Sequence, residues 1–194
     1  PIVRYTDIET QLKQRTINIS KFGIGAELFV KGLAKKVLLA DNLSVLYSSI
    51  CGHPQMSVFT SWLGILAYTM QLYFDFSGYS DMAIGLGKML GFDFNKNFDY
   101  PYISTSVSEF WRRWHISLGS WFRDYIYIPL GGNRVSTLKH IRNILVVWAL
   151  TGLWHGASWN FVLWGVYYGL FLLLEKFVLQ KYLKKIPSWL CTVY

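Results

Sequence analysis

Long uncharged stretches separate charged segments along this chain, and their lengths predict membrane helices. Residues 56–74 contain no Asp, Glu, Lys or Arg over 19 positions. At about 1.5 Å rise per residue, a helix of this length extends roughly 28 Å, close to the hydrocarbon thickness of a bilayer. We therefore predict a transmembrane helix at residues 56–74.

The uncharged stretch at residues 143–174 covers 32 positions. A straight helix of that length would be about 48 Å long, more than one crossing needs. Basic residues flank both ends, namely Lys139 and Arg142 before the stretch and Lys176, Lys181, Lys184 and Lys185 after it. Because cytoplasmic loops carry an excess of Lys and Arg, both ends are expected on the cytoplasmic side. The segment must then enter the membrane and return, and the predicted bend is at His155-Gly156.

This bend divides the stretch into unequal arms. Residues 143–154 would be about 18 Å long as a helix, and residues 157–174 about 27 Å. The shorter arm cannot cross a hydrocarbon core of about 30 Å. We therefore predict that His155 lies at bilayer depth, within protein or at the wall of a water-accessible cavity, because bent backbone is tolerated at that depth only in such a place.

The amino-terminal half combines polar, amphipathic and glycine-rich segments. Residues 1–21 are polar and are predicted to form a loop at a membrane face. Residues 22–50 are predicted to form an amphipathic helix, which either lies along the interface or spans at a tilt. In residues 75–92, Asp75 and Asp81 stand among glycines. Carboxylates are costly at membrane depth, so this segment is expected to face protein or a watery cavity.

Ser106 and Glu109 form a capping-box pattern that predicts the start of a further helix, and Gly119 is a residue that can end it. The predicted helix carries an apolar stripe of Trp111, Trp114, Leu118 and Trp121. A short, charged, Trp-rich helix is expected to be interfacial or re-entrant rather than spanning. The sequence PLGGNR at residues 129–134 predicts a turn.

Composition agrees with a lipid-embedded protein. Hydrophobic residues make up 53% of the 194 positions and charged residues 15%, against roughly 25% charged in soluble domains. Nine Trp and thirteen Tyr are residue types that collect at membrane interfaces. The net charge of +8 fits an anionic membrane surface, and no recognition module for nucleic acid accompanies it. We expect an all-α, multi-pass integral membrane protein with spanning, interfacial and re-entrant helices in a single domain over residues 1–194, and no binding of nucleic acid.

Several residues are expected to have ordinary roles. Cys51 and Cys191 lack partner spacing and are expected to be small buried apolar residues rather than a disulfide or zinc site. No two histidines stand three or four positions apart, so no metal site is expected. His53 is expected in a loop and His140 in a solvated basic cluster. The chain begins with Pro1 and shows no leader pattern, so we expect an internal fragment of a longer protein.

His155 is the first candidate for chemistry, because an ionisable residue at bilayer depth is a functional candidate by default. A neutral imidazole there would suit a general base toward a hydroxyl. A histidine hydrogen-bonded between helices for packing is an equally open interpretation. For His115, catalysis, orientation of a carbonyl and anchoring at the headgroup level all remain open. Arg112 either contacts phosphates or belongs to a charged cytoplasmic face.

Three segments, FDFSGYSDMAIGLGKMLGF, SEFWRRWHISLGSWFRDYIYIPLGGNR and LTGLWHGASWNFVLWG, follow one another between residues 73 and 170. They closely resemble the motifs of the membrane-bound O-acyltransferase (MBOAT) family, and most of all its bacterial branch that contains the alginate O-acetyltransferase membrane subunit. The segment GLAKKVLLADNL at residues 32–43 also fits that branch. The chain is thus similar to the core of a larger MBOAT protein.

The resemblance implies transfer of an acyl group, expected to be acetyl, from a cytoplasmic thioester through a tunnel to a hydroxyl of an exported polysaccharide such as alginate. The implied donor is acetyl-coenzyme A or an acyl carrier protein, used as substrate, with no permanently bound cofactor. The family's functional histidine pair maps onto His155, in the WHG motif, and His115, in the RWH motif. The residues expected to line or brace the tunnel are Trp154, Trp159, Asn160, Trp164, Trp111 and Arg112.

The resemblance also implies a place in the cell inner membrane and a partner there, an exported SGNH-type acetyltransferase or another polysaccharide-modifying complex. Export of D-alanyl groups to teichoic acid by the same chemistry is an alternative within the family. Two alternatives lie outside this chemistry. One is a transporter or channel with His and Asp lining a path, and the other is a scaffold that positions a separate acyltransferase.

Overall fold

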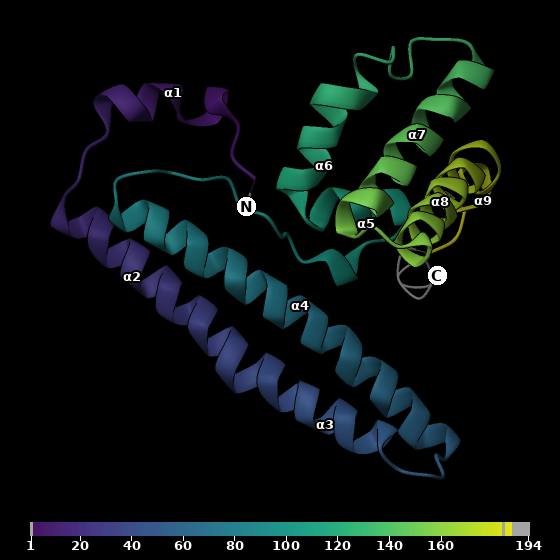
Figure 1. The fold of residues 1–194 in the computed structure, drawn as a ribbon, viewed down its shortest axis with the longest axis horizontal. Coiled ribbons are helices and arrows are strands. Elements are labelled where there is room, and N and C mark those ends of the chain that lie inside the picture. Colours follow the sequence, from purple (N-terminus) through teal and green to yellow (C-terminus); the bar gives the residue numbers. More distant parts are fainter. Residues whose placement is uncertain (1, 184, 188–194) are drawn as a thin grey trace. The chain divides into compact units, whose positions relative to one another are not determined.

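The structure, a computed structural model, describes residues 2–183 and 185–187 of the chain. All regular secondary structure within these residues is helical, which confirms the all-α prediction (Figure 1). The described residues divide into two compact units, Val3–Asn97 and the part from Phe98 onward together with Ile2. Membership of both units in one membrane domain stays a prediction.

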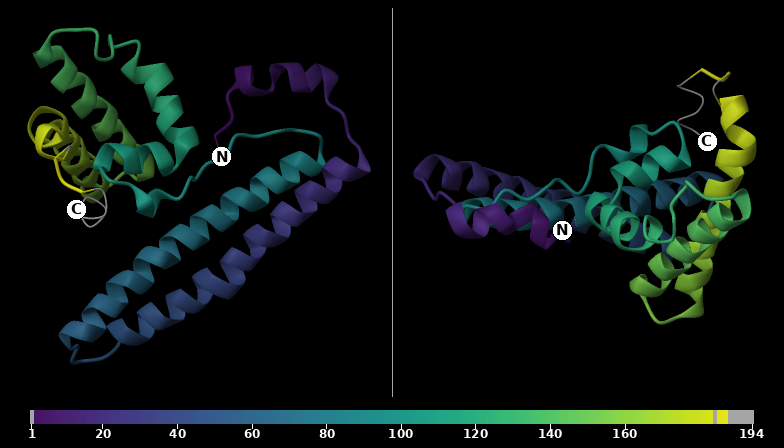
Figure 2. Two further views of the ribbon diagram at one scale, coloured as in Figure 1. Left: turned by 180° about the vertical axis from the view of Figure 1, so that it is seen from behind. Right: turned by 90° about the horizontal axis from the view of Figure 1, so that it is seen from above.

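The first unit is a pair of long antiparallel helices preceded by a short one (Figures 1 and 2). Its helices are α1 (Tyr5–Gln14), α2 (Ile19–Ala34), α3 (Asp41–Cys51) and α4 (Val58–Met89), and the π-helical turn η1 (Lys35–Ala40) joins α2 to α3. The continuous helix formed by α2, η1 and α3 confirms the helix predicted at residues 22–50. The loop predicted for residues 1–21 is wrong at its centre, where Asp7 accepts hydrogen bonds from Arg4 and α1 begins.

Two pairs of glycines bring α2 and α4 into backbone contact. A Cβ atom added to Gly32 would lie 2.6 Å from the carbonyl oxygen of Gly78, and one added to Gly25 would lie 2.6 Å from that of Gly85. The two glycines of each helix are seven positions apart, which is about two turns, so both pairs fall on one seam. Small residues permit this close approach of helices in membranes, where packing rather than the hydrophobic effect drives association.

Lysines of the neighbouring helix neutralise the aspartates of α4 beside this seam. The Nζ atom of Lys35 lies 2.6 Å from the Asp81 carboxylate. The Nζ atom of Lys36 lies 2.7 Å from the carboxylates of both Asp75 and Asp41. The segment at residues 75–92 thus packs against protein and its carboxylates have partners there, as predicted from their cost at membrane depth.

The second unit combines short helices with a helical hairpin (Figure 1). Its first elements are the 3-10 turn η2 (Pro101–Ile103), the helices α5 (Val107–Arg113) and α6 (Ile116–Phe122), and the π-helical turn η3 (Arg123–Tyr127). The hairpin consists of α7 (Thr137–His155) and a helix that is continuous through α8 (Trp159–Leu174), the π-helical turn η4 (Glu175–Leu179) and α9 (Gln180–Leu183). The interruption after His155 confirms the predicted bend.

The single helix predicted from Ser106 to Gly119 is wrong, because the chain breaks at Trp114 and His115. Ser106 does cap α5, since its hydroxyl accepts a hydrogen bond from the backbone N–H of Glu109 at 3.0 Å. His115 then takes a left-handed φ of 47° and starts α6 in a new direction. Gly119 lies inside α6 and does not end a helix.

The structure also tests the predicted turn at residues 129–134 and the predicted burial of the cysteines. The turn predicted at residues 129–134 is confirmed, with Gly131 and Gly132 at φ values of 97° and 56° that favour glycine. Cys51, expected to be buried, is exposed at the end of α3. Cys191 lies outside the described residues.

Two helices expose extensive apolar surface. In the part of the chain that the structure describes, the continuous helix Trp159–Leu183 is the one that is long and apolar enough to cross a membrane. The first turns of α4 also expose large apolar side chains, with Val58 78%, Phe59 76% and Trp62 62% exposed. An apolar surface of this kind fits contact with lipid or another protein. Spanning by residues 56–74 stays a prediction.

Replacing Gly32 by Ala should destabilise the full-length protein, because the new methyl group would meet the backbone of α4. The expected cost is about 1–3 kcal/mol, which is typical of an overpacked contact. Gly23→Ala is the matched control, since Gly23 is also on α2 but has open space around it. This control should be neutral or mildly stabilising. Thermal unfolding of the purified protein in detergent measures the effect, and equal midpoints for the two variants would contradict the glycine seam.

Candidate active site

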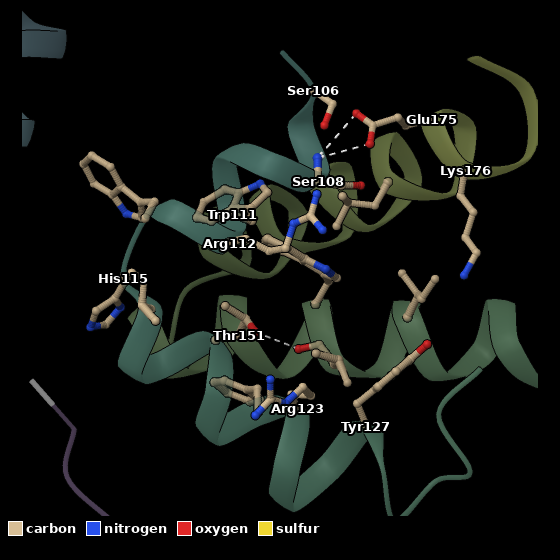
Figure 3. A pocket seen from close by; sticks show the side chains of 18 of the residues that line it. Ser106, Ser108, Trp111, Arg112, His115, Arg123, Tyr127, Thr151, Glu175 and Lys176 are labelled. Carbon is tan, nitrogen blue, oxygen red and sulfur yellow. Dashed lines mark hydrogen bonds between the residues drawn. The ribbon is translucent and has the colours of Figure 1, made fainter. Parts of the chain in front are cut away.

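A cavity of about 980 Å³ lies within the second unit, lined by α5, α6, α7 and the helix that continues α8 (Figure 3). One face of α7 contributes residues along its whole length, mostly at the spacing of three or four positions that marks one side of a helix. These residues are His140, Ile144, Val147, Trp148, Thr151 and His155. The two histidines at the ends of α7 therefore belong to one continuous wall.

His155 is the last residue of α7, and a hydrogen bond fixes the orientation of its ring. Its Nδ1 atom lies 2.8 Å from the carbonyl oxygen of Thr151, one turn earlier. A carbonyl only accepts hydrogen bonds, so Nδ1 carries the proton and Nε2 of the neutral ring keeps its lone pair. The side chain is exposed, and it lines the cavity. His155 thus lies at a cavity wall, while its depth in a bilayer stays a prediction.

His115 occupies the break between α5 and α6 and is buried, with 7% of its surface exposed. A left-handed backbone conformation costs a residue other than glycine about 1–2 kcal/mol, so the surrounding packing must hold it there. Burial, and secondly the nearby His155, lower the pKa of His115 to about 4. The ring is therefore neutral at physiological pH and able to donate one hydrogen bond and accept another.

Aromatic side chains connect and support the two histidines. The Trp154 ring centroid lies 5.8 Å from that of His115 and 5.1 Å from that of His155. On α8, the Trp164 ring lies 4.9 Å from His155. Trp164 belongs to a cluster of edge-to-face contacts around Trp111, whose other members are Trp148 and Tyr168. Such contacts favour defined ring orientations and so limit the freedom of the His155 side chain.

The remaining residues predicted for the tunnel divide into two groups. Trp111 and Arg112, both on α5, line the cavity, and Arg112 is exposed there (Figure 3). Trp159 and Asn160, at the start of α8, do not line it. Both are exposed, and Trp159 is 79% exposed. Closeness to His155 in sequence therefore does not bring these two residues to the cavity.

Comparison with known proteins gives this site its context. The model of the membrane-bound O-acyltransferase family, MBOAT, matches residues 1–185. The chain belongs to this family. It is 51% identical over 176 residues to the probable alginate O-acetylase AlgI of Azotobacter vinelandii, an alignment that covers 91% of this chain and 35% of that protein.

Two other relatives are less similar to this chain. The peptidoglycan O-acetyltransferase of Helicobacter pylori is 39% identical over 204 residues, which cover 99% of this chain and 38% of that protein. A teichoic acid D-alanyltransferase of Streptococcus thermophilus is 35% identical over 131 residues, covering 61% of this chain and 31% of that protein. The chain thus spans about a third of the length of these curated relatives.

Two residues in the wall of this cavity, Glu175 and His140, were not predicted there from the sequence. Glu175 is 5% exposed, and its carboxylate accepts a hydrogen bond from the backbone N–H group of Val107 at 2.6 Å. It accepts another from the backbone N–H group of Ser108 at 3.2 Å (Figure 3). His140, predicted to be solvated, is only 6% exposed. One signal for Glu175 was available, since it is the first charged residue after the uncharged stretch.

Lowering the pH from about 7 to about 5 should destabilise the wild-type protein more than a His115→Asn variant. An unfolded histidine takes up a proton near pH 6.5, whereas folded His115 resists protonation until about pH 4. The unfolded state thus binds more protons within this window, and stability falls as the pH decreases through it. Asparagine is chosen because it tolerates a left-handed backbone. Thermal midpoints of the full-length protein at both pH values measure the difference, and equal losses would contradict the burial of His115.

Replacing Glu175 by Ala should destabilise the protein by about 1–3 kcal/mol, because two backbone N–H groups at the start of α5 lose their acceptor. Glu175→Gln keeps one carbonyl oxygen and should recover part of the loss. Denaturation of the full-length protein in detergent measures both variants. Wild-type stability of the alanine variant would show that α5 is held by other contacts.

Proposed function

We propose that this chain is the catalytic part of an O-acyltransferase that moves an acyl group, an acetyl group in our proposal, from a cytoplasmic thioester to a hydroxyl of an exported polysaccharide such as alginate. The observation that carries the proposal is a cavity, in a member of the MBOAT family, that is lined by both His155 and His115. The identity to proteins named alginate O-acetylase supports the choice of acceptor.

In this proposal His155 is the general base. Its Nε2 lone pair takes the proton of the acceptor hydroxyl while the hydroxyl oxygen attacks the carbonyl carbon of the thioester. The new carbon–oxygen bond forms, the carbon–sulfur bond breaks, and the leaving thiolate receives the proton that His155 took from the hydroxyl. The hydrogen bond from Nδ1 to Thr151 supports this role, because it keeps the proton off Nε2 in the neutral ring.

His115 assists as a neutral hydrogen-bond donor. An acyl transfer develops negative charge on the carbonyl oxygen, and a fixed donor stabilises that charge. The low pKa of His115 supports a donor role without a role in carrying away the proton. Trp154, which touches both rings, keeps them oriented around the same end of the cavity.

The remaining parts of the proposal concern topology and partners. We place the protein in the cell inner membrane as a multi-pass protein with both flanks of α7 and α8 in the cytoplasm. The donor is acetyl-coenzyme A or an acyl carrier protein, and the acceptor complex includes an exported SGNH-type acetyltransferase. D-alanyl transfer to teichoic acid is the second candidate, favoured by the 35% identity to a teichoic acid D-alanyltransferase.

Replacing His155 by Ala should abolish acyl transfer to the external acceptor, with a loss of about 100-fold or more as expected for a general base. His115→Ala should weaken transfer less. The measurement is acyl transfer by membranes that contain the full-length protein and its partners, with radiolabelled acetyl and D-alanyl donors offered separately.

His53→Ala is the matched control, because His53 is exposed in the loop between α3 and α4 and lines no described cavity. Protein level and thermal stability should match the wild type in all three variants. Near-normal acylation by His155→Ala would refute the catalytic assignment. Ion flux without an acyl donor would instead favour a transporter or channel, and full transfer by every histidine variant would favour a scaffold.

A further inference from the structure

The cavity has a second polar end, far from His155. His140 and His155 lie on the same cavity-facing side of α7, 15 positions apart, which corresponds to about 22 Å along the helix. In Figure 3, Lys176 and Tyr127 point toward each other at one end of the cavity, and His115 lies at the opposite end. The wall between the ends is largely apolar, with Ile144, Val147, Trp148 and Leu172 among its residues.

A hydrogen-bonded cluster orients Lys176 at this end. The Nε2 atom of buried His140 lies 3.2 Å from Lys176 Nζ and 3.1 Å from the Tyr127 hydroxyl. An ammonium group only donates hydrogen bonds, so Nε2 of His140 is the acceptor and bears no proton. His140 thereby positions the ammonium without adding a charge of its own.

Within the described part of the chain, the positive charge of Lys176 is not balanced by a carboxylate partner. Among the residues that the structure describes, no carboxylate forms an ion pair with Lys176. Glu175, the neighbouring acid, is already bound to the backbone N–H groups of Val107 and Ser108. Arg112 also lines the cavity, as does Arg123, whose guanidinium is paired with Asp124 at 2.7 Å. A cationic site next to apolar walls attracts an anionic ligand.

We propose that Lys176, positioned by His140 and Tyr127, binds the phosphate ester at the end of the pantetheine arm of the acyl donor. The inference rests on the proposed function. A pantetheine arm carries its phosphate at one end and its thioester at the other, joined by a largely apolar chain. With the phosphate at Lys176, the arm lies along α7 and its thioester reaches the end of the cavity that His155 and His115 line. Coenzyme A and a carrier protein share this phosphate ester.

The test compares Lys176→Gln with Lys181→Gln in the full-length protein. Lys181 is on the same helix but outside the cavity, where its ammonium lies 4.8 Å from the Tyr182 ring. Lys176→Gln should raise the KM for an acetyl-pantetheine phosphate donor about 10-fold or more, as expected for loss of a charge-assisted bond, and change kcat by less than about threefold. Lys176→Arg should recover part of the loss. Lys181→Gln should match the wild type.

A donor without phosphate separates binding of the anion from a general structural effect. Acetyl-pantetheine should be a poor substrate of the wild type, and Lys176→Gln should not weaken it further. An equal rise in KM for both donors, or no rise for the phosphorylated donor, would overturn the proposal. Assays with acetyl-coenzyme A and with an acetylated carrier protein then identify which donor supplies the phosphate. If only one of them is the natural donor, Lys176→Gln should raise the KM for that donor alone. If both donors bind at Lys176, the KM for both should rise.

The outcomes also separate this inference from the proposed function. In one outcome, the wild-type protein transfers acyl groups and His155→Ala does not, but Lys176→Gln and Lys181→Gln have the same KM for every donor. The acyltransferase assignment then stands and the proposed phosphate site is wrong. If His155→Ala retains full transfer, the acyltransferase mechanism fails irrespective of Lys176. Thermal unfolding of each variant confirms that the folded protein is being compared.

Discussion

Direct contact between helix backbones is the interaction on which the rest of each unit depends. In the hairpin of the second unit, Gly152 on α7 meets the backbone of Phe161, and Gly165 on α8 meets the carbonyl of Trp148. Side chains larger than hydrogen cannot occupy these crossings. Because the hydrophobic effect provides little driving force for helix association in lipid, close packing of this kind has to stabilise the helix pair. It fixes α7 against α8 and so holds in place the cavity wall that carries His140 and His155.

The same hairpin places His155 at the end of α7, in the wall of the cavity. Gly156, which follows it, has an extended backbone that any residue could adopt, so φ does not require glycine there. The requirement is steric, because an added Cβ would lie 2.5 Å from the Phe161 ring. The ring seals the inside of the bend, and α7 stops with His155 at its end. The Nδ1 atom of His155 bonds back to the helix, which leaves Nε2 as the base in the proposed mechanism.

Structural features that depend on segment length and charge were predicted from the sequence. Features that depend on contacts between distant segments were not. The bend at His155 followed from an uncharged stretch too long for one crossing, and the structure has it. No glycine or proline at His115 indicates a helix break, and the capping pattern of Ser106 and Glu109 favoured one longer helix. It exists because packing holds a histidine in a left-handed conformation. His140 stands in a basic run and looked solvated, yet Tyr127 and Lys176 reach it from other elements and bury it.

In the part of the chain that the structure describes, three π-helical turns each begin with two charged residues: Lys35–Ala40, Arg123–Tyr127 and Glu175–Leu179. Such a turn holds one residue more than an α-helix needs over the same span. Removing that residue would let the turn close into an α-helix while the helix before and after it keeps its orientation. At η4, a one-residue deletion beyond Lys176 would thus leave Gln180 and Leu183 on the cavity wall, where both side chains lie. Relatives can therefore differ in the length of this helix and still present the same wall to the cavity.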